Sequence, residues 1–237
     1  MIDLRRTIAG VGSLYREATD GERQYAGTCF SVLDPGIFVT AAHCLGNEDV
    51  RGLWINHFGA SDNDCFNRIN NAYKIPEADI AVVMTDATNG KWVRPFAAVQ
   101  FAVDYGEEIY AIGHPDIFQE DSNERHLRFL RGIIQRPFLY EPPRGKPYSA
   151  FELSFACPTG LSGAPIILAK APQVVIGVVT ANYDTHTVVD TEKIEGESRV
   201  VETRRIISYG VAANIMHAAP KLEELLGRPL PNPLAYT

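Results

Sequence analysis

Residues 151–168 read FELSFACPTGLSGAPIIL and contain a serine, Ser162, between two glycines in a turn that separates two apolar runs. Apolar runs of this length predict β-strands, and the Gly-rich segment between them predicts a tight turn. A hydroxyl held on such a turn projects from the strands, and the turn can direct backbone N–H groups to a point beside it. Exposure and a preformed oxyanion site are what a serine nucleophile requires. The alternative is an ordinary β-turn.

A serine hydroxyl needs a base, and the base needs an orienting group. Of the six histidines, His43 follows an apolar, β-branched run and small residues, in GIFVTAAHC (36–44). Asp79 stands at the head of the apolar run DIAVVM (79–84). A carboxylate in that position is partly buried and needs a partner, which an imidazole N–H supplies. We therefore predict that His43 is the base and Asp79 its orienting carboxylate.

The motifs TAAHC (40–44), DIAV (79–82) and GLSGAP (160–165) together resemble those of the chymotrypsin/trypsin-like serine peptidases. They stand in the His, Asp, Ser order of that family. The stretch IYAIGHP (109–115) is similar to a strand and turn of its bacterial members. The resemblance implies an oxyanion hole made by the N–H groups of Gly160 and Ser162. It also implies that Thr180 hydrogen-bonds Asp79, the alternative being a buried strand threonine.

The fold expected from the pattern is all-β, because short β-type runs recur about every ten residues with Gly, Pro and Asn between them. The resemblance implies a chymotrypsin-like pair of six-stranded antiparallel β-barrels. We expect residues 1–100 to form the first barrel, with the histidine and aspartate, and residues 101–237 to form the second, with the serine. Residues 220–227 (PKLEELLG) predict a short C-terminal helix, with Pro in its first turn and Gly past its end.

Two segments of the second half are predicted to be loops. Residues 136–148 are rich in Pro and Arg, and residues 184–204 carry many charges with little periodicity. In the family, loops of the second barrel border the substrate cleft. The 184–204 segment is therefore either a specificity or partner element or a plain solvated excursion.

The specificity pocket is placed by the resemblance alone. Alignment on Ser162 puts Ala156 at the base of the first pocket, where relatives that cut after Lys or Arg carry an acid. Asn182 falls where relatives have glycine, which narrows the pocket mouth. We therefore expect a small or medium uncharged side chain before the scissile bond, and we count Ala156, Thr180 and Asn182 as substrate-binding residues.

Composition and charge exclude several classes of protein. The formal charge is −7 with 22 Lys and Arg that form no dense cluster, which argues against a nucleic-acid-binding surface. No apolar run approaches the roughly 18 residues of a membrane helix. The N-terminus lacks an apolar signal core, which predicts a cytoplasmic protein, or an exported one if a presequence has been removed.

Four cysteines, including Cys65 and Cys157, do not make a disulfide scaffold. Cys29 and Cys44 match a bridged pair of extracellular relatives, and they are either a disulfide or two adjacent thiols according to the compartment. No Cys-x-x-Cys or His-x-x-x-His spacing predicts a zinc site, so we expect neither metal nor cofactor.

The function implied is that of a serine endopeptidase acting on polypeptides through His43, Asp79 and Ser162. In digestive relatives an aspartate precedes the serine and pairs with a freshly cut N-terminus. Leu161 stands there instead, so activation by N-terminal cleavage is not expected. Two alternatives stay open: a catalytically silent module that binds peptides, and a peptidase held inactive until a regulatory protein partner binds.

Overall fold

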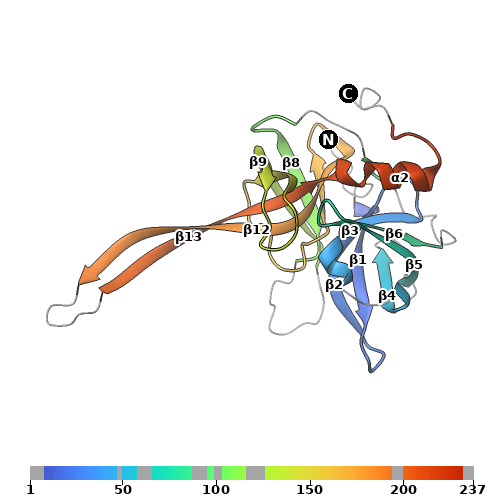
Figure 1. Cartoon of the computed structure of the whole chain (residues 1–237), viewed down its shortest axis with the longest axis horizontal. Helices are drawn as coiled ribbons and strands as arrows, with labels where there is room; N and C mark the ends of the chain where they lie inside the picture. The colour runs from blue at the N-terminus through green and yellow to red at the C-terminus, as the bar shows by residue number, and fades with distance from the viewer. Residues whose placement is uncertain are drawn as a thin grey trace.

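The structure is a computed structural model that describes residues 8–46, 50–57, 66–86, 95–98, 103–115, 126–193 and 200–231, with the backbone alone at residues 57, 186–193 and 200–205. Two β-sheets make up most of it, and a short helix lies near the C-terminus (Figure 1). Within the described residues, no helix has the length and apolar character needed to cross a membrane.

The first sheet is a closed barrel of six antiparallel strands in the order β1-β2-β3-β6-β5-β4. It confirms the barrel predicted for the first half of the chain. Two short 3-10 helices, η1 (Ala42–Leu45) and η2 (Val50–Gly52), lie between the third and fourth strands of the chain. The strands are β1 (Val11–Glu17), β2 (Arg23–Ser31), β3 (Ile37–Ala41), β4 (Leu53–His57), β5 (Phe66–Ile75) and β6 (Ile80–Thr85).

The second sheet has seven strands in the order β11-β8-β9-β10-β13-β12-β7, and β12 also pairs with β11. It differs from the predicted six-stranded antiparallel barrel because β7 adds a strand that runs parallel to β12. The strands are β7 (Ala97–Ala98), β8 (Glu108–Gly113), β9 (Arg128–Tyr140), β10 (Tyr148–Leu153), β11 (Pro165–Leu168), β12 (Ala171–Lys193) and β13 (Val200–Asn214).

The segment predicted as a loop over residues 184–204 is instead part of a long two-stranded ribbon in its described residues, 184–193 and 200–204. Among the described residues, the outer parts of β12 and β13 pair only with each other, from Tyr183 opposite Tyr209 to Lys193 opposite Val200. In Figure 1 this ribbon runs far beyond the body of the sheet. Backbone pairing between the two segments forms the ribbon despite the weak side-chain periodicity, and this is why the sequence pattern did not reveal it.

The predicted loop over residues 136–148 is also shorter than expected. Strand β9 continues to Tyr140, and β10 begins at Tyr148, so only residues 141–147 connect them. Pro137 is accommodated within β9 opposite Phe151 of β10. The connection therefore forms the tip of a hairpin rather than a long excursion.

One hydrophobic core cluster contains residues of both sheets. Phe30 and Val39 of the first sheet belong to it together with Val175 and Val211 of the second, and all four are fully buried. The sheets are therefore packed against each other through a common core, along a boundary that we call the seam.

The C-terminal helix α2 (Ala219–Leu226) confirms the prediction, and it follows the 3-10 turn η4 (Ile215–Ala218). Its first turn contains Pro220, and Gly227 ends it in the left-handed conformation with φ +62°. Leu222 is fully buried, and Leu225 and Leu226 pack on the shared core. These three leucines therefore anchor the helix to the sheets.

Candidate active site

His43 and Asp79 make two hydrogen bonds to each other. The backbone N–H of His43 donates to Oδ1 of Asp79 at 2.9 Å, and Nδ1 of the imidazole lies 2.5 Å from Oδ2. About 48% of the His43 side chain and 27% of the Asp79 side chain are exposed. Because Nδ1 faces the carboxylate, Nε2 is the nitrogen left to accept a proton from another group.

Local chain geometry explains why these two residues meet. Strand β3 pairs with β6, with Ala41 opposite Ile80, so the residues that follow β3 lie beside those that precede β6. The N–H of Ala42 donates to the carbonyl of Asp79 at 3.1 Å, where η1 begins. The buried run of β6 fixes Asp79 at its head, and the turn of η1 brings His43 over the carboxylate.

Ser162 lies in a double turn that β2 holds in place. The carbonyl of Pro158 accepts from the N–H of Leu161, and the carbonyl of Leu161 accepts from the N–H of Ala164. The N–H of Thr28 donates to the carbonyl of Ser162 at 2.8 Å. Hydrogen bonds from the first sheet therefore fix a turn that belongs to the second sheet.

The carbonyl of Gly160 points to the same strand. It accepts a hydrogen bond from the hydroxyl of Tyr25 at 2.7 Å and another from Oγ1 of Thr28 at 3.0 Å. Gly160 has φ +88°, a conformation that glycine adopts without steric cost. Fixing this carbonyl also fixes the orientation of the peptide group that ends in the N–H of Leu161.

Two N–H groups of the serine turn differ from their neighbours in their backbone hydrogen bonding. Among the described residues, no backbone carbonyl accepts from the N–H of Gly160 or of Ser162, whereas the N–H groups of Leu161 and Gly163 are paired with Pro158 and Val179. These are the two donors predicted for the oxyanion hole. Donors that are left unpaired in this way can bind an anionic oxygen without first breaking a hydrogen bond.

Ser162 is brought next to the turn that carries His43, although the imidazole and the hydroxyl are not hydrogen-bonded to each other. The Cys44 thiol donates to the carbonyl of Ser162 at 3.7 Å. A Cβ at Gly27 would stand 2.6 Å from the Cys44 sulfur and 2.9 Å from the Ser162 carbonyl oxygen, so both lie against that glycine. Catalytic hydrogen bonds are often long in unliganded enzymes and shorten when substrate binds.

Thr180 is buried but does not hydrogen-bond Asp79 as the resemblance implied. Its Oγ1 pairs instead with the hydroxyl of Tyr148 at 3.2 Å and with the carbonyl of Val211 at 3.4 Å. Tyr148 of β10, Thr180 and Asp79 all line one cleft, and there the threonine hydroxyl bonds the tyrosine and not the carboxylate. The open alternative, a buried strand threonine, describes Thr180 in this structure.

Ala156 and Asn182 lie close together, on the segment before the serine turn and on β12. Oδ1 of Asn182 accepts from the N–H of Cys157 at 2.7 Å, and Nδ2 donates to its carbonyl at 2.5 Å. Ala156, which directly precedes Cys157, is exposed beside these two hydrogen bonds. The amide of Asn182 thus fastens β12 to the segment that carries Ala156. The pocket assigned to these residues stays a prediction.

The described cysteines are buried thiols, and neither Cys29 nor Cys44 is in a disulfide. Burial, and then the nearby Cys44, raise the pKa of Cys29 far above its ordinary value of 9.0. Burial raises the pKa of Cys157 to about 12, so this thiol stays protonated and is no rival nucleophile near neutral pH. Cys65 lies outside the described residues.

No group of three or more His, Cys, Asp or Glu side chains suited to a metal ion occurs in the described part of the chain.

Several residues that shape the site were not predicted from the sequence. Tyr25 and Thr28 hold the serine turn, and Tyr148 holds Thr180. Thr28 and Gly160 are 132 residues apart, and no local pattern signals that they meet.

The pKa of the His43 imidazole sets the pH dependence expected for kcat/KM. Burial lowers the pKa of His43, but the hydrogen bond to Asp79 and the neighbouring Cys44 outweigh this effect and raise it from 6.5 to about 10. A raised pKa keeps the imidazole protonated to higher pH, and only the neutral form accepts a proton. If His43 is the base, kcat/KM should therefore rise with pH and be half-maximal above pH 6.5.

Asp79→Asn removes the largest favourable partner of the imidazolium, so it should lower kcat and move the rising limb to lower pH. The measurement is kcat/KM from about pH 5 to pH 10 for both proteins. If the rising limb of the kcat/KM profile lay at the same pH in wild type and in Asp79→Asn, Asp79 would not set the pKa of the base.

Comparison with known proteins places this chain in a family. Residues 27–178 match the family of trypsin-like peptidase domains. The match covers more than half of the chain, and the chain therefore belongs to this family. No curated protein matches the sequence.

Solved structures similar to this chain are proteases or protease relatives. The active form of the Rv3671c protease from M. tuberculosis has 14% identity and a TM-score of 0.62, over 92% of this chain and 82% of that one. The scabies mite inactivated protease paralogue S-I1 has 12% identity and a TM-score of 0.64, over 94% and 96%. The HtrA-type protease AlgW with a tripeptide has 17% identity and a TM-score of 0.62, over 95% and 63%. At these identities the similarity establishes the fold.

Proposed function

We propose that the protein is a serine endopeptidase that hydrolyses peptide bonds through His43, Asp79 and Ser162. The observation that carries the proposal is the pairing of His43 with Asp79 at a seam that also holds Ser162 in a turn with two N–H groups not paired to described carbonyls. Each part has a role in acyl transfer, and the three residues come from separate segments of the chain. Membership of the trypsin-like peptidase family supports the same reaction class.

The mechanism follows from the atoms. Oγ of Ser162 attacks the peptide carbonyl while Nε2 of His43 takes its proton, and Asp79 stabilises the imidazolium through Nδ1. The N–H groups of Gly160 and Ser162 bind the oxyanion of the tetrahedral intermediate. His43 then gives the proton to the leaving amine, and water hydrolyses the acyl-enzyme by the same steps. The proton returns to Ser162 at the end, so the cycle needs no cofactor.

The reaction does not depend on cleavage at the N-terminus. Leu161, which precedes the serine, is fully buried in an apolar cluster and has no charge to pair with a new amino terminus. Packing of this leucine, together with the bonds from Tyr25 and Thr28, orders the turn in the intact chain. The substrate is a polypeptide, with a small or medium uncharged side chain near Ala156 before the scissile bond.

One observation favours a second candidate, a module that is silent or that needs a regulatory protein partner. His43 and Ser162 are not hydrogen-bonded to each other, and the fold occurs in an inactivated paralogue. A partner that moves η1 toward the serine turn would complete the proton path. In that case the purified chain is inactive alone.

The experiment is to incubate the purified chain of residues 1–237 with an unfolded protein and to identify the new termini by mass spectrometry. We expect cleavage mainly after small or medium uncharged residues. A strict preference for Lys or Arg would contradict the assignment of Ala156 to the pocket. The absence of new termini would contradict the peptidase proposal for the isolated chain.

A further inference from the structure

A cleft of about 490 Å³ opens directly beside the histidine–aspartate pair. The cleft is lined by His43, Asp79 and Thr180. It is also lined by the aromatic rings of Tyr140 and Tyr148. The tip of the β9–β10 hairpin, residues 142–146, forms the opposite side. A polypeptide lying across His43 therefore places a neighbouring side chain in this cleft.

The cleft carries an excess of positive charge. Lys74, Arg144 and Lys146 line it, and its one acidic residue is Asp79, whose carboxylate is engaged by His43. No described acidic side chain forms an ion pair with Arg144 or Lys146, which are both exposed at the hairpin tip. The whole chain, by contrast, has a formal charge of −7. A cationic cleft on an acidic protein is a local feature rather than a consequence of composition.

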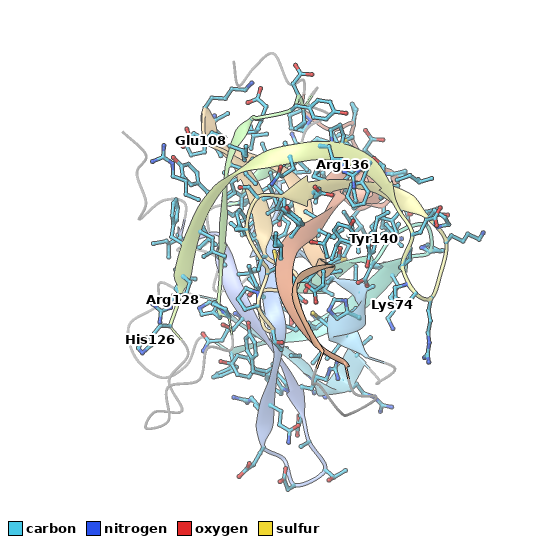
Figure 2. All side chains as sticks on the ribbon, turned by 90° about the vertical axis from the view of Figure 1, so that its left-hand side faces the viewer. Lys74, Glu108, His126, Arg128, Arg136 and Tyr140 are labelled. Carbon is cyan, nitrogen blue, oxygen red and sulfur yellow. The ribbon has the colours of Figure 1, made fainter. Side chains whose placement is uncertain are left out.

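Lys74 is held in position within this arrangement. Its Nζ donates to the carbonyl of Gly46, at the end of the η1 turn that carries His43. Figure 2 shows Lys74 and Tyr140 on the same side of the molecule, with Arg128 at the distant end of β9. One cation is thus fixed next to the turn that carries His43, and two others line the same cleft from the hairpin tip.

We propose that this cleft binds an acidic side chain of the polypeptide substrate, an aspartate or glutamate within a few residues of the scissile bond. The inference rests on the proposed peptidase function and adds a substrate preference to it. The tyrosines and prolines of the cleft pack against the methylene groups of the side chain, and the cations attract its carboxylate. Each such partly exposed pair contributes modestly, so three together should change kcat/KM roughly five- to fifty-fold.

The test uses pairs of peptides built on a sequence that the protein cleaves, with Glu or Gln at one position at a time on either side of the scissile bond. At one or more of these positions, wild type should cleave the Glu peptide faster than its Gln partner. This ratio should fall toward one at about 1 M salt, where charges are screened within about 3 Å. The double variant Arg144→Glu, Lys146→Glu should remove or reverse the ratio.

Arg128→Glu is the matched control, because it also changes an exposed cation of β9 to an acid but lies far from Tyr140 (Figure 2). It should keep the wild-type Glu-to-Gln ratio, and thermal unfolding should show that all variants are folded. Equal cleavage of every Glu and Gln pair by wild type would overturn the cleft assignment while leaving the peptidase proposal intact. An equal loss of preference in Arg128→Glu would also overturn it. Failure to cleave any peptide or unfolded protein would instead refute the peptidase function itself.

Discussion

Ser162→Ala is expected to lower kcat by about 10⁴–10⁶, with the fold unchanged. The substitution removes only Oγ, for which no described residue provides a hydrogen bond, while the turn is held by backbone and by Tyr25 and Thr28. Loss of the nucleophile eliminates the acyl-enzyme, and water must then attack the peptide directly. The residual rate comes from the oxyanion donors and from substrate binding.

The measurement is the steady-state hydrolysis of a peptide that wild type cleaves, together with a thermal unfolding curve for each protein. Ser149→Ala is the matched control, because Ser149 is an exposed serine of β10 outside the site. It should retain wild-type kcat. A Ser162→Ala protein that keeps more than about a tenth of the wild-type kcat would exclude Ser162 as the nucleophile.

Gly163→Ala is expected to have the largest effect on stability. Gly163 has φ +85°, and a Cβ there would stand 2.0 Å from the carbonyl oxygen of Thr28 and 2.4 Å from Oγ1 of Thr40. The left-handed conformation alone costs an alanine about 1–2 kcal/mol. Displacing backbone at the seam adds overpacking of about 1–3 kcal/mol or more. Because the turn cannot move without breaking its bonds to β2, catalytic activity should be lost as well.

Gly21→Ala separates these two contributions. Gly21 has nearly the same backbone angle, φ +84°, but a Cβ there has no atom within 4 Å. The free energy of unfolding of Gly21→Ala, measured in urea, should therefore fall only by the cost of placing an alanine in the left-handed conformation. If Gly163→Ala is too unstable to purify, the comparison is made as soluble yield. An equal loss for the two variants would show that the contact between the serine turn and β2 is not tight.

The contact between His43 and Asp79 could be predicted because local sequence marks each residue. His43 follows a buried apolar strand, and Asp79 begins another, so a buried carboxylate and an available imidazole were both visible in short stretches of sequence. The turn around Ser162 was recognisable for the same reason, since glycines at 160 and 163 adopt positive φ. The regular spacing of the strand-like runs predicted the all-β class, whereas the closed six-stranded barrel of the first half was implied by the family resemblance and not by the spacing.

Features that depend on distant pairing were not predicted. The ribbon of β12 and β13 is formed by backbone pairing over segments without clear alternation, and its charges had indicated a loop. Thr180 bonds Tyr148 rather than Asp79, because β10 brings a tyrosine to that position. The cationic cleft unites Lys74 with Arg144 and Lys146, which no sequence window contains together. Such sets become visible only when the topology is known.

The central claim is that Ser162 is a nucleophile activated by His43 in the isolated chain, and covalent labelling tests it most directly. A fluorophosphonate reacts when a serine Oγ attacks phosphorus and fluoride leaves, so labelling requires an activated hydroxyl. Mass spectrometry of the digested wild type should place the phosphonyl group on Ser162, and neither Ser162→Ala nor His43→Ala should be labelled appreciably. A folded wild-type protein that stays unlabelled, or that is labelled at another residue, would contradict the claim.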